Sequence, residues 1–186
     1  MGIPEGAIVS SKDYLNLELH SSERHEFFLG HIINMAGASR EHLEIQSNII
    51  YLLMHEYRSR KTDCSAYGSD LRLKANDLKY FYPDITVVCG QAEFDKKSKS
   101  LINPTGVIEI LSRSTRDFDV DEKAFAYRAI ASLNEFVLID SESQRIMVYE
   151  RKGETVWELR EYNDQSDCRF FDTVFSMAEI YRNVNF

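Results

Sequence analysis

Apolar and polar positions follow two different periods along this chain, and the changes of period divide it into elements. Between residues 39 and 58, apolar side chains recur at near-helical spacing, and Ser39 can cap the start of that helix. Runs of mostly apolar residues follow at 66–74, 80–89 and 106–111, and each predicts a strand. A second helix is predicted over residues 120–131, and a fourth core strand over 135–140.

The flanking segments predict smaller elements. A short helix is expected from about Ser10 or Ser11 to residue 19, and then a hairpin of 23–29 and 31–35 about Gly30. Residues 91–104 are polar, rich in lysine and closed by Asn-Pro, which predicts a surface loop. A second hairpin (145–151 and 155–162) and a short helix (177–182) close the chain. This order predicts an α/β fold with a mixed sheet, and nothing in the 186 residues suggests a second domain.

Two of the predicted strand segments each carry one acidic residue among apolar neighbours. Asp84 directly precedes the apolar run Ile85-Thr86-Val87-Val88, and Glu109 lies within the run 106–111. Burying an unpaired carboxylate is costly, so such groups usually face a cation, a metal or several hydrogen-bond donors. If the two strands are neighbours, we expect Asp84 and Glu109 to converge.

Lys123 supplies a third group, in the predicted helix that follows Glu109. Tyr127 lies four residues after it and Asp119 four residues before it, so all three share one helical face. Two carboxylates can hold Mg²⁺, with Mn²⁺ as a substitute, and a nearby ammonium can offset charge on a reacting phosphate. No His or Cys cluster has zinc spacing. The set therefore favours metal-assisted phosphodiester hydrolysis. The plainer alternative is an exposed helical lysine paired with Asp119.

The order of these residues resembles the PD-(D/E)XK nuclease superfamily, and within it the Uma-two family of restriction-endonuclease-like proteins. The fragments that carry the resemblance are residues 24–32, 39–42, 69–73, 82–84, 109–115, 119–123 and 134–140. The resemblance implies a restriction-endonuclease-like core of helix, three strands, helix and strand. It also implies a metal-dependent DNA endonuclease with Asp84 and Glu109 as metal ligands and Lys123 as the catalytic cation.

One departure from the superfamily pattern leaves an alternative open. The superfamily usually has Lys two residues after the strand Glu, where this chain has Leu111, and Lys123 resembles a migrated replacement. Leu111 and the net charge of −8 favour a binding or assembly module that has kept the fold and lost cleavage. The complete Asp84, Glu109 and Lys123 set favours the enzyme.

The resemblance suggests further site residues. Glu26 lies in the fragment 24–32 and is expected as an auxiliary carboxylate, although it could equally be an ordinary strand residue. His42 and Asp70 are expected to support the site, with structural roles as the alternative. Arg113 and Arg116 follow the Glu109 strand, and we expect them to contact the substrate. The alternative is that both are ordinary solvent-exposed surface residues.

Composition adds expectations about surroundings and assembly. No apolar run approaches twenty residues and the first eleven residues do not resemble a signal peptide, so we expect a cytoplasmic protein without membrane contact. Three scattered cysteines, Cys64, Cys89 and Cys168, are expected to be reduced. The apolar content of the 145–162 hairpin, together with the pairing common among superfamily nucleases, favours a homodimer.

Overall fold

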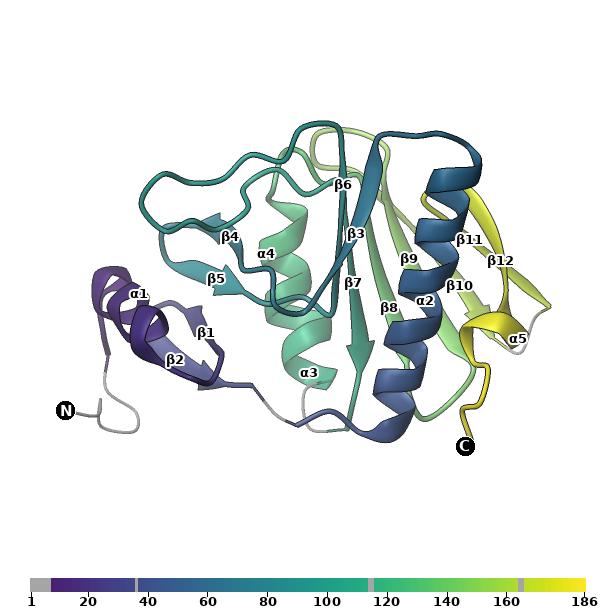
Figure 1. The fold of residues 1–186 in the computed structure, drawn as a ribbon, viewed down its shortest axis with the longest axis horizontal. Helices are drawn as coiled ribbons and strands as arrows, with labels where there is room; N and C mark the ends of the chain where they lie inside the picture. The colour runs from purple at the N-terminus through teal and green to yellow at the C-terminus, as the bar shows by residue number, and fades with distance from the viewer. Residues whose placement is uncertain (1–7, 36, 114–115, 164–165) are drawn as a thin grey trace.

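The computed structural model describes residues 8–35, 37–113, 116–163 and 166–186. Its largest sheet has six strands in the order β10-β9-β8-β7-β6-β3 (Figure 1). Only β7 and β8 run parallel within it, so the sheet is mixed as predicted. Its strands are β3 (Cys64–Gly68), β6 (Ile85–Cys89), β7 (Gly106–Leu111), β8 (Glu135–Asp140), β9 (Arg145–Arg151) and β10 (Trp157–Asn163).

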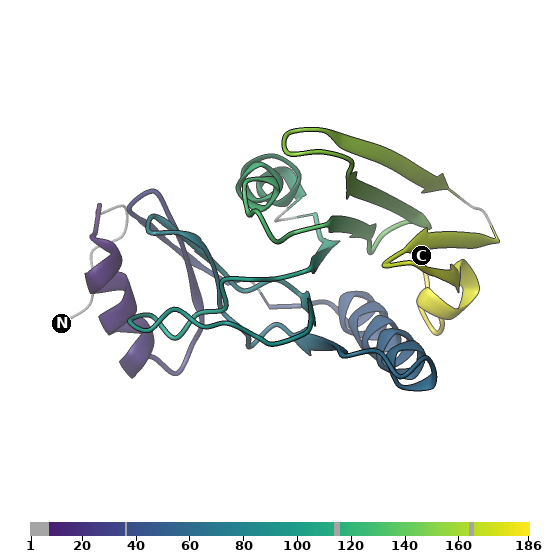
Figure 2. The same cartoon turned by 90° about the horizontal axis from the view of Figure 1, so that it is seen from above.

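Helices cover both faces of this sheet (Figure 2). On one face, α2 (Arg40–Ser59) buries Ile45, Ile49 and Leu53 against Ile108 and Ile110 of β7. On the other face lie α3 (Arg116–Phe118), a π-helical turn (Asp119–Lys123) and α4 (Ala124–Arg128). Both faces of β7 are therefore buried, which explains why it reads as an almost continuous apolar run.

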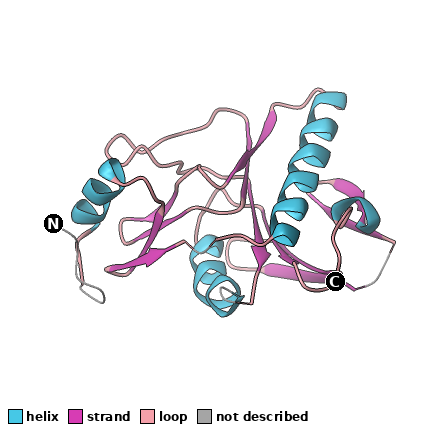
Figure 3. Ribbon diagram, turned by 60° about the horizontal axis from the view of Figure 1, so that its bottom comes forward, coloured by secondary structure: helices cyan, strands magenta, loops and turns pink. Residues whose placement is uncertain are grey.

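A second sheet of four strands lies at the N-terminal end of the molecule. Its order is β2-β1-β5-β4, made of β1 (His25–Phe28), β2 (His31–Asn34), β4 (Leu73–Asn76) and β5 (Lys79–Phe81). Helix α1 (Ser11–His20) packs Tyr14 against Phe27 and Tyr80 of this sheet. At the opposite end lie the hairpin of β11 (Asp167–Phe170) and β12 (Thr173–Ser176) and helix α5 (Met177–Ile180) (Figure 3).

The predicted α/β fold is confirmed, including the core order and both terminal hairpins, but several elements differ from the predictions. The stretches 66–74 and 80–89 are not single strands, because each contributes one strand to each sheet. Pro83 lies at the second break, where a residue without an N–H cannot continue a ladder. The predicted helix 120–131 begins as the π-helical turn, continues as α4 and ends at Arg128. The β11–β12 hairpin was not predicted.

The expectation that all three cysteines are reduced is wrong in this structure. The register of β3 and β6 places Cys64 directly opposite Cys89, and the two form a disulfide. Cys168 is free and buried. The pairing depends on which strands become neighbours, so the 25-residue separation in sequence gave no sign of it. Among the described helices, none is long and apolar enough to cross a membrane.

Candidate metal and nuclease site

The two acidic residues predicted to converge do so at one end of the six-stranded sheet. Asp84 directly precedes β6, and Glu109 lies in β7, in antiparallel strands that pair Ile85 with Ile108. The Asp84 backbone N–H donates to Glu109 Oε2 at 3.3 Å. The Ile110 backbone N–H donates to Asp84 Oδ2 at 2.7 Å, which fixes that carboxylate beside β7. Adjacent strands thus hold both carboxylates without help from a flexible loop.

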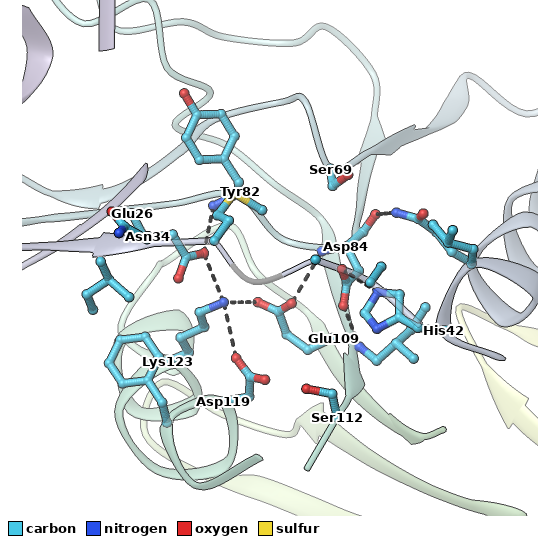
Figure 4. Close-up of a pocket in the computed structure, with 18 residues that line it drawn as sticks. Glu26, Asn34, His42, Ser69, Tyr82, Asp84, Glu109, Ser112, Asp119 and Lys123 are labelled. Carbon is cyan, nitrogen blue, oxygen red and sulfur yellow. Dashed lines mark hydrogen bonds and ion pairs between the residues drawn. The ribbon is translucent and has the colours of Figure 1, made fainter. Parts of the chain in front are cut away.

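Lys123 reaches this pair from the π-helical turn on the neighbouring layer. Its Nζ lies 2.9 Å from Glu26 Oε1, 3.1 Å from Asp119 Oδ1 and 3.3 Å from Glu109 Oε1 (Figure 4). The lysine side chain is 8% exposed, so the alternative is wrong about its exposure, although the expected pairing with Asp119 is present. Lysine has three donors, and three carboxylate oxygens lie within reach of them.

Glu26 comes from the second sheet and joins the two sheets at the site. On β1, Glu26 and Phe27 point to opposite faces, since side chains alternate along a strand, and Phe27 packs under α1. Glu26 Oε1 accepts a hydrogen bond of 3.0 Å from the Tyr82 backbone N–H as well as the contact from Lys123. The strand β1 therefore places a carboxylate against the segment that leads into Asp84.

The start of α2 supplies two groups that hold Asp84. Ser39 accepts a hydrogen bond from the His42 backbone N–H and caps the helix. His42 Nε2 then lies 2.9 Å from Asp84 Oδ1. One turn further on, Gln46 donates from Nε2 to the Asp84 backbone carbonyl at 2.8 Å. The helix that packs on the sheet therefore also fixes the position of this carboxylate.

The site contains more acidic than basic groups, and this shapes its electrostatics. Burial raises the pKa of Glu109 well above its ordinary value, and nearby carboxylates add to the rise, whereas Lys123 opposes it. Burial likewise raises the pKa of Glu26, again opposed by Lys123. Burial disfavours the charged form of Lys123, but Glu109, Glu26 and Asp119 outweigh this and raise the pKa of the ammonium. A further cation beside these carboxylates would oppose the raised pKa of Glu109 and Glu26 and favour their charged forms.

The donor set fits a hard divalent cation held by few protein ligands. Asp84 and Glu109 are close enough for the Asp84 backbone N–H to bond Glu109 Oε2, and Mg²⁺ commonly takes one or two carboxylates and completes its shell with water and phosphate oxygens. Within the described residues, no group of three or more His, Cys, Asp or Glu side chains is placed to hold a metal ion, so any ion here would have two protein carboxylates at most. The residues present therefore suit Mg²⁺ or Mn²⁺ better than a structural zinc.

These groups line a cavity of about 420 Å³ between the two sheets and the start of α2 (Figure 4). Its floor is acidic, with Lys123 among the carboxylates. Its walls are mostly apolar, and they include Ile33, Met35, Leu43 and Phe118. The arrangement can present a cation and an ammonium to an anionic group that enters the cavity.

Some residues expected at the site lie elsewhere. The Asp70 side chain is 93% exposed and faces Arg24 at 3.5 Å, so its expected supporting position is wrong. Asp70 was expected in a strand, but it lies in the turn between β3 and β4. Arg113 pairs with Glu142 at 3.1 Å and Arg116 with Asp140 at 2.9 Å, and neither lines the cavity.

Three further residues contact the site: the sequence placed Asp119 and Tyr127 on the helical face of Lys123 without assigning them to the site, and it gave Gln46 no role. Asp119 contacts Lys123, and Tyr127 donates to Glu109 Oε1 at 2.6 Å. Their spacing of four residues on either side of Lys123 was the available signal. Gln46 lies four residues after His42, so the same helical spacing could have indicated it.

A mixed sheet that carries two carboxylates on neighbouring strands, with a lysine from the following helical segment, defines a restriction-endonuclease-like fold. The chain belongs to the Uma2 (Uma-two) family, whose model is described as "Putative restriction endonuclease" and matches residues 11–177.

Two curated relatives and one solved structure are similar to this chain. Uncharacterized protein sll1609 of Synechocystis sp. is 36% identical over 156 residues, covering 83% of this chain and 87% of the relative. Uncharacterized protein slr1290 of the same organism is 30% identical over 182 residues, covering 96% and 94%. A crystal structure titled as a "putative nuclease belonging to DUF820" from Anabaena variabilis superposes with a TM-score of 0.74. It is 20% identical and covers 93% of this chain and 97% of its own, so it supports the fold.

Proposed function

We propose that this protein is a metal-dependent endonuclease that hydrolyses DNA phosphodiester bonds. The observation that carries the proposal is the buried Lys123 ammonium, held within 3.3 Å of Glu26, Asp119 and Glu109, beside Asp84. Maintaining a buried cation among carboxylates costs desolvation energy, and a purely structural role does not require it. Membership of a family whose model is described as "Putative restriction endonuclease" supports the same proposal.

In this proposal Asp84 and Glu109 hold the metal, with Mg²⁺ as the natural ion and Mn²⁺ as a substitute. A bound divalent ion would supply Lewis-acid activation of a phosphate and a more acidic water. The Ile110 N–H and His42 keep Asp84 in place, and the Tyr127 hydroxyl does the same for Glu109.

Lys123 is proposed to offset the negative charge that develops on the phosphate. Its three donors are already matched, so one carboxylate contact must weaken before the ammonium can meet a substrate oxygen. The contact to Glu109 is the longest and is the one we expect to yield. Glu26 and Asp119 then hold Lys123 in place as auxiliary carboxylates.

The test is cleavage of supercoiled and single-stranded DNA by the purified protein with Mg²⁺, with Mn²⁺ and with a chelator. We expect metal-dependent products that disappear in Glu109→Gln and persist in the matched acidic-to-amide control, Asp70→Asn. Binding of DNA without cleavage under any metal condition would support the rival, an inactive binding or assembly module. Cleavage that survives the chelator would contradict metal dependence.

A further inference from the structure

The depth of the site restricts what can reach it. Glu109, Asp119, Glu26 and Lys123 are 2%, 3%, 4% and 7% exposed, so a scissile phosphate must enter the cavity to meet them. A phosphate that remained at the protein surface would meet the rim of the cavity instead. The substrate must therefore project its backbone into the protein.

The size of the cavity sets a second limit. A volume of 420 Å³ falls in the range of small-molecule pockets, roughly 300–1,000 Å³. A cavity of this size has no room for both strands of a duplex, whose major groove alone is about 12 Å wide. A paired strand cannot bring its phosphate to the floor without carrying its partner strand along. One nucleotide of an unpaired strand meets no such obstacle.

The side chains that line the cavity also favour an unpaired strand over a duplex. Affinity for duplex DNA comes mainly from Lys and Arg side chains that neutralise many phosphates. Among the described residues that line the cavity, only Lys123 and His42 can carry positive charge, and both already face carboxylates. Unpaired strands also use positive charge along their backbone, but they bind in addition through stacking of their bases on aromatic side chains. Phe118 offers an aromatic side chain beside the acidic floor, and Met35 and Leu43 add apolar surface on the cavity walls.

We propose that the substrate of this site is an unpaired strand of DNA, as found in single strands, flaps and bubbles. One nucleotide enters the cavity with its phosphate toward Asp84, Glu109 and Lys123 and its base against the apolar wall that includes Leu43. This inference rests on the proposed nuclease function but makes a separate claim, since it concerns the strandedness of the ligand.

The first experiment compares one labelled sequence as a single strand, as a blunt duplex and as a duplex with a central bubble. Cleavage is followed with Mn²⁺, and binding is followed by fluorescence anisotropy with Ca²⁺ in place of Mn²⁺. We expect the single strand and the bubble to be cut, and the single strand to be bound, at least about tenfold better than the blunt duplex. Equal or better binding and cleavage of the blunt duplex would overturn the inference and leave the nuclease function intact.

The second experiment uses variants of two exposed leucines. Leu43 is 50% exposed on the cavity wall, and Leu19 is 78% exposed on α1, away from the site. Leu43→Glu should weaken single-strand binding by about fivefold or more, since it places a charge beside the entering base, whereas Leu19→Glu should change nothing. Equal binding by the two variants would overturn the assigned base contact.

Failure of the two proposals can be told apart. Suppose that no DNA is cut, but the single strand binds more tightly than the duplex and Leu43→Glu weakens single-strand binding. The preference for an unpaired strand is then supported, and the proposed nuclease function is wrong. If no DNA is cut and the single strand binds no better than the duplex, both are wrong.

Discussion

Tyr127 Oη lies 2.6 Å from Glu109 Oε1, so the tyrosine donates a hydrogen bond to the same carboxylate oxygen that faces Lys123. This oxygen therefore has two donors, whereas Glu109 Oε2 receives the longer, 3.3 Å bond from the Asp84 N–H. Oε2 therefore has one long hydrogen bond and Oε1 has two contacts, so Oε2 is the oxygen with more capacity left to accept a cation.

A shared cation predicts that Mn²⁺ affinity depends on both carboxylates. Asp84→Asn and Glu109→Gln should each weaken Mn²⁺ binding sharply, because each removes a charged ligand from a site with few protein ligands. Isothermal titration calorimetry measures this, with Asp70→Asn as the control because Asp70 is an exposed carboxylate outside the cavity. Wild-type affinity in both site variants would rule out the assigned ligands.

Lys123→Ala is expected to reduce both cleavage and stability. Loss of transition-state electrostatics should slow cleavage about a hundredfold or more. Because Lys123 is buried among three carboxylates, its loss should also cost roughly 3–5 kcal/mol of unfolding free energy. Cleavage rates per folded molecule, together with urea unfolding, separate the two effects.

Lys97→Ala is the matched control for this prediction, since Lys97 is exposed in the loop before β7. If Lys123→Ala cleaves at the wild-type rate while Arg113→Ala or Arg116→Ala does not, the catalytic cation has been misassigned. One of those arginines would then take the role, although each pairs with an acidic side chain in this structure.

Asp95 predicts an acid-dependent loss of stability away from the site. Bonds from the backbone N–H and hydroxyl of Ser98 lower the pKa of Asp95, and Lys74 adds to the shift. The folded-state pKa thus lies below the unfolded value of about 3.9, so this stabilisation is present above that pH and is lost as the pH falls through the folded-state pKa.

Asp95→Asn should therefore destabilise the protein at pH 7, and its difference from wild type should shrink as the pH falls below about 4. Urea unfolding at a series of pH values measures the effect, with the exposed Asp167→Asn as control. A difference from wild type that stays constant with pH would show that the charge of Asp95 is not the cause.

The Cys64–Cys89 disulfide predicts a thiol count. Titration in denaturant without reductant should find one thiol per chain, from Cys168, and three after reduction. Cys64→Ser should lower stability by about 2–4 kcal/mol under oxidising conditions and by far less under reducing ones. Three thiols before reduction would show that the pair is reduced in the isolated protein.

Self-association stays a prediction, and the structure narrows where to look for it. Ile146 and Val148 of the β9–β10 hairpin are buried in the core, so they cannot form the expected interface. Leu159 is half exposed on β10, which is an edge strand of the six-stranded sheet. We expect light scattering at tens of micromolar, a range that suits a stable interface, to show a dimer that Leu159→Glu weakens. A wild-type monomer would contradict the prediction.

The sequence determined the elements whose pattern is local. Strands β7 and β8 match their predicted bounds, because both faces of each are buried and the apolar runs end where burial ends. Helix α2 begins after Ser39 as predicted, since a cap is a contact between near neighbours in the chain. The single acidic residues in apolar segments likewise singled out Asp84 and Glu109 before any pairing was known.

Only the tertiary structure decided which segments became neighbours. The division of residues 66–89 between two sheets, the disulfide, and the exposure of Asp70 all depend on strand pairing between distant residues. The same holds for the burial of Lys123 between β1, β7 and the π-helical turn, where three elements each supply a carboxylate. Periodicity reports which face of an element is apolar, but the partner of that face is set by packing across the whole chain.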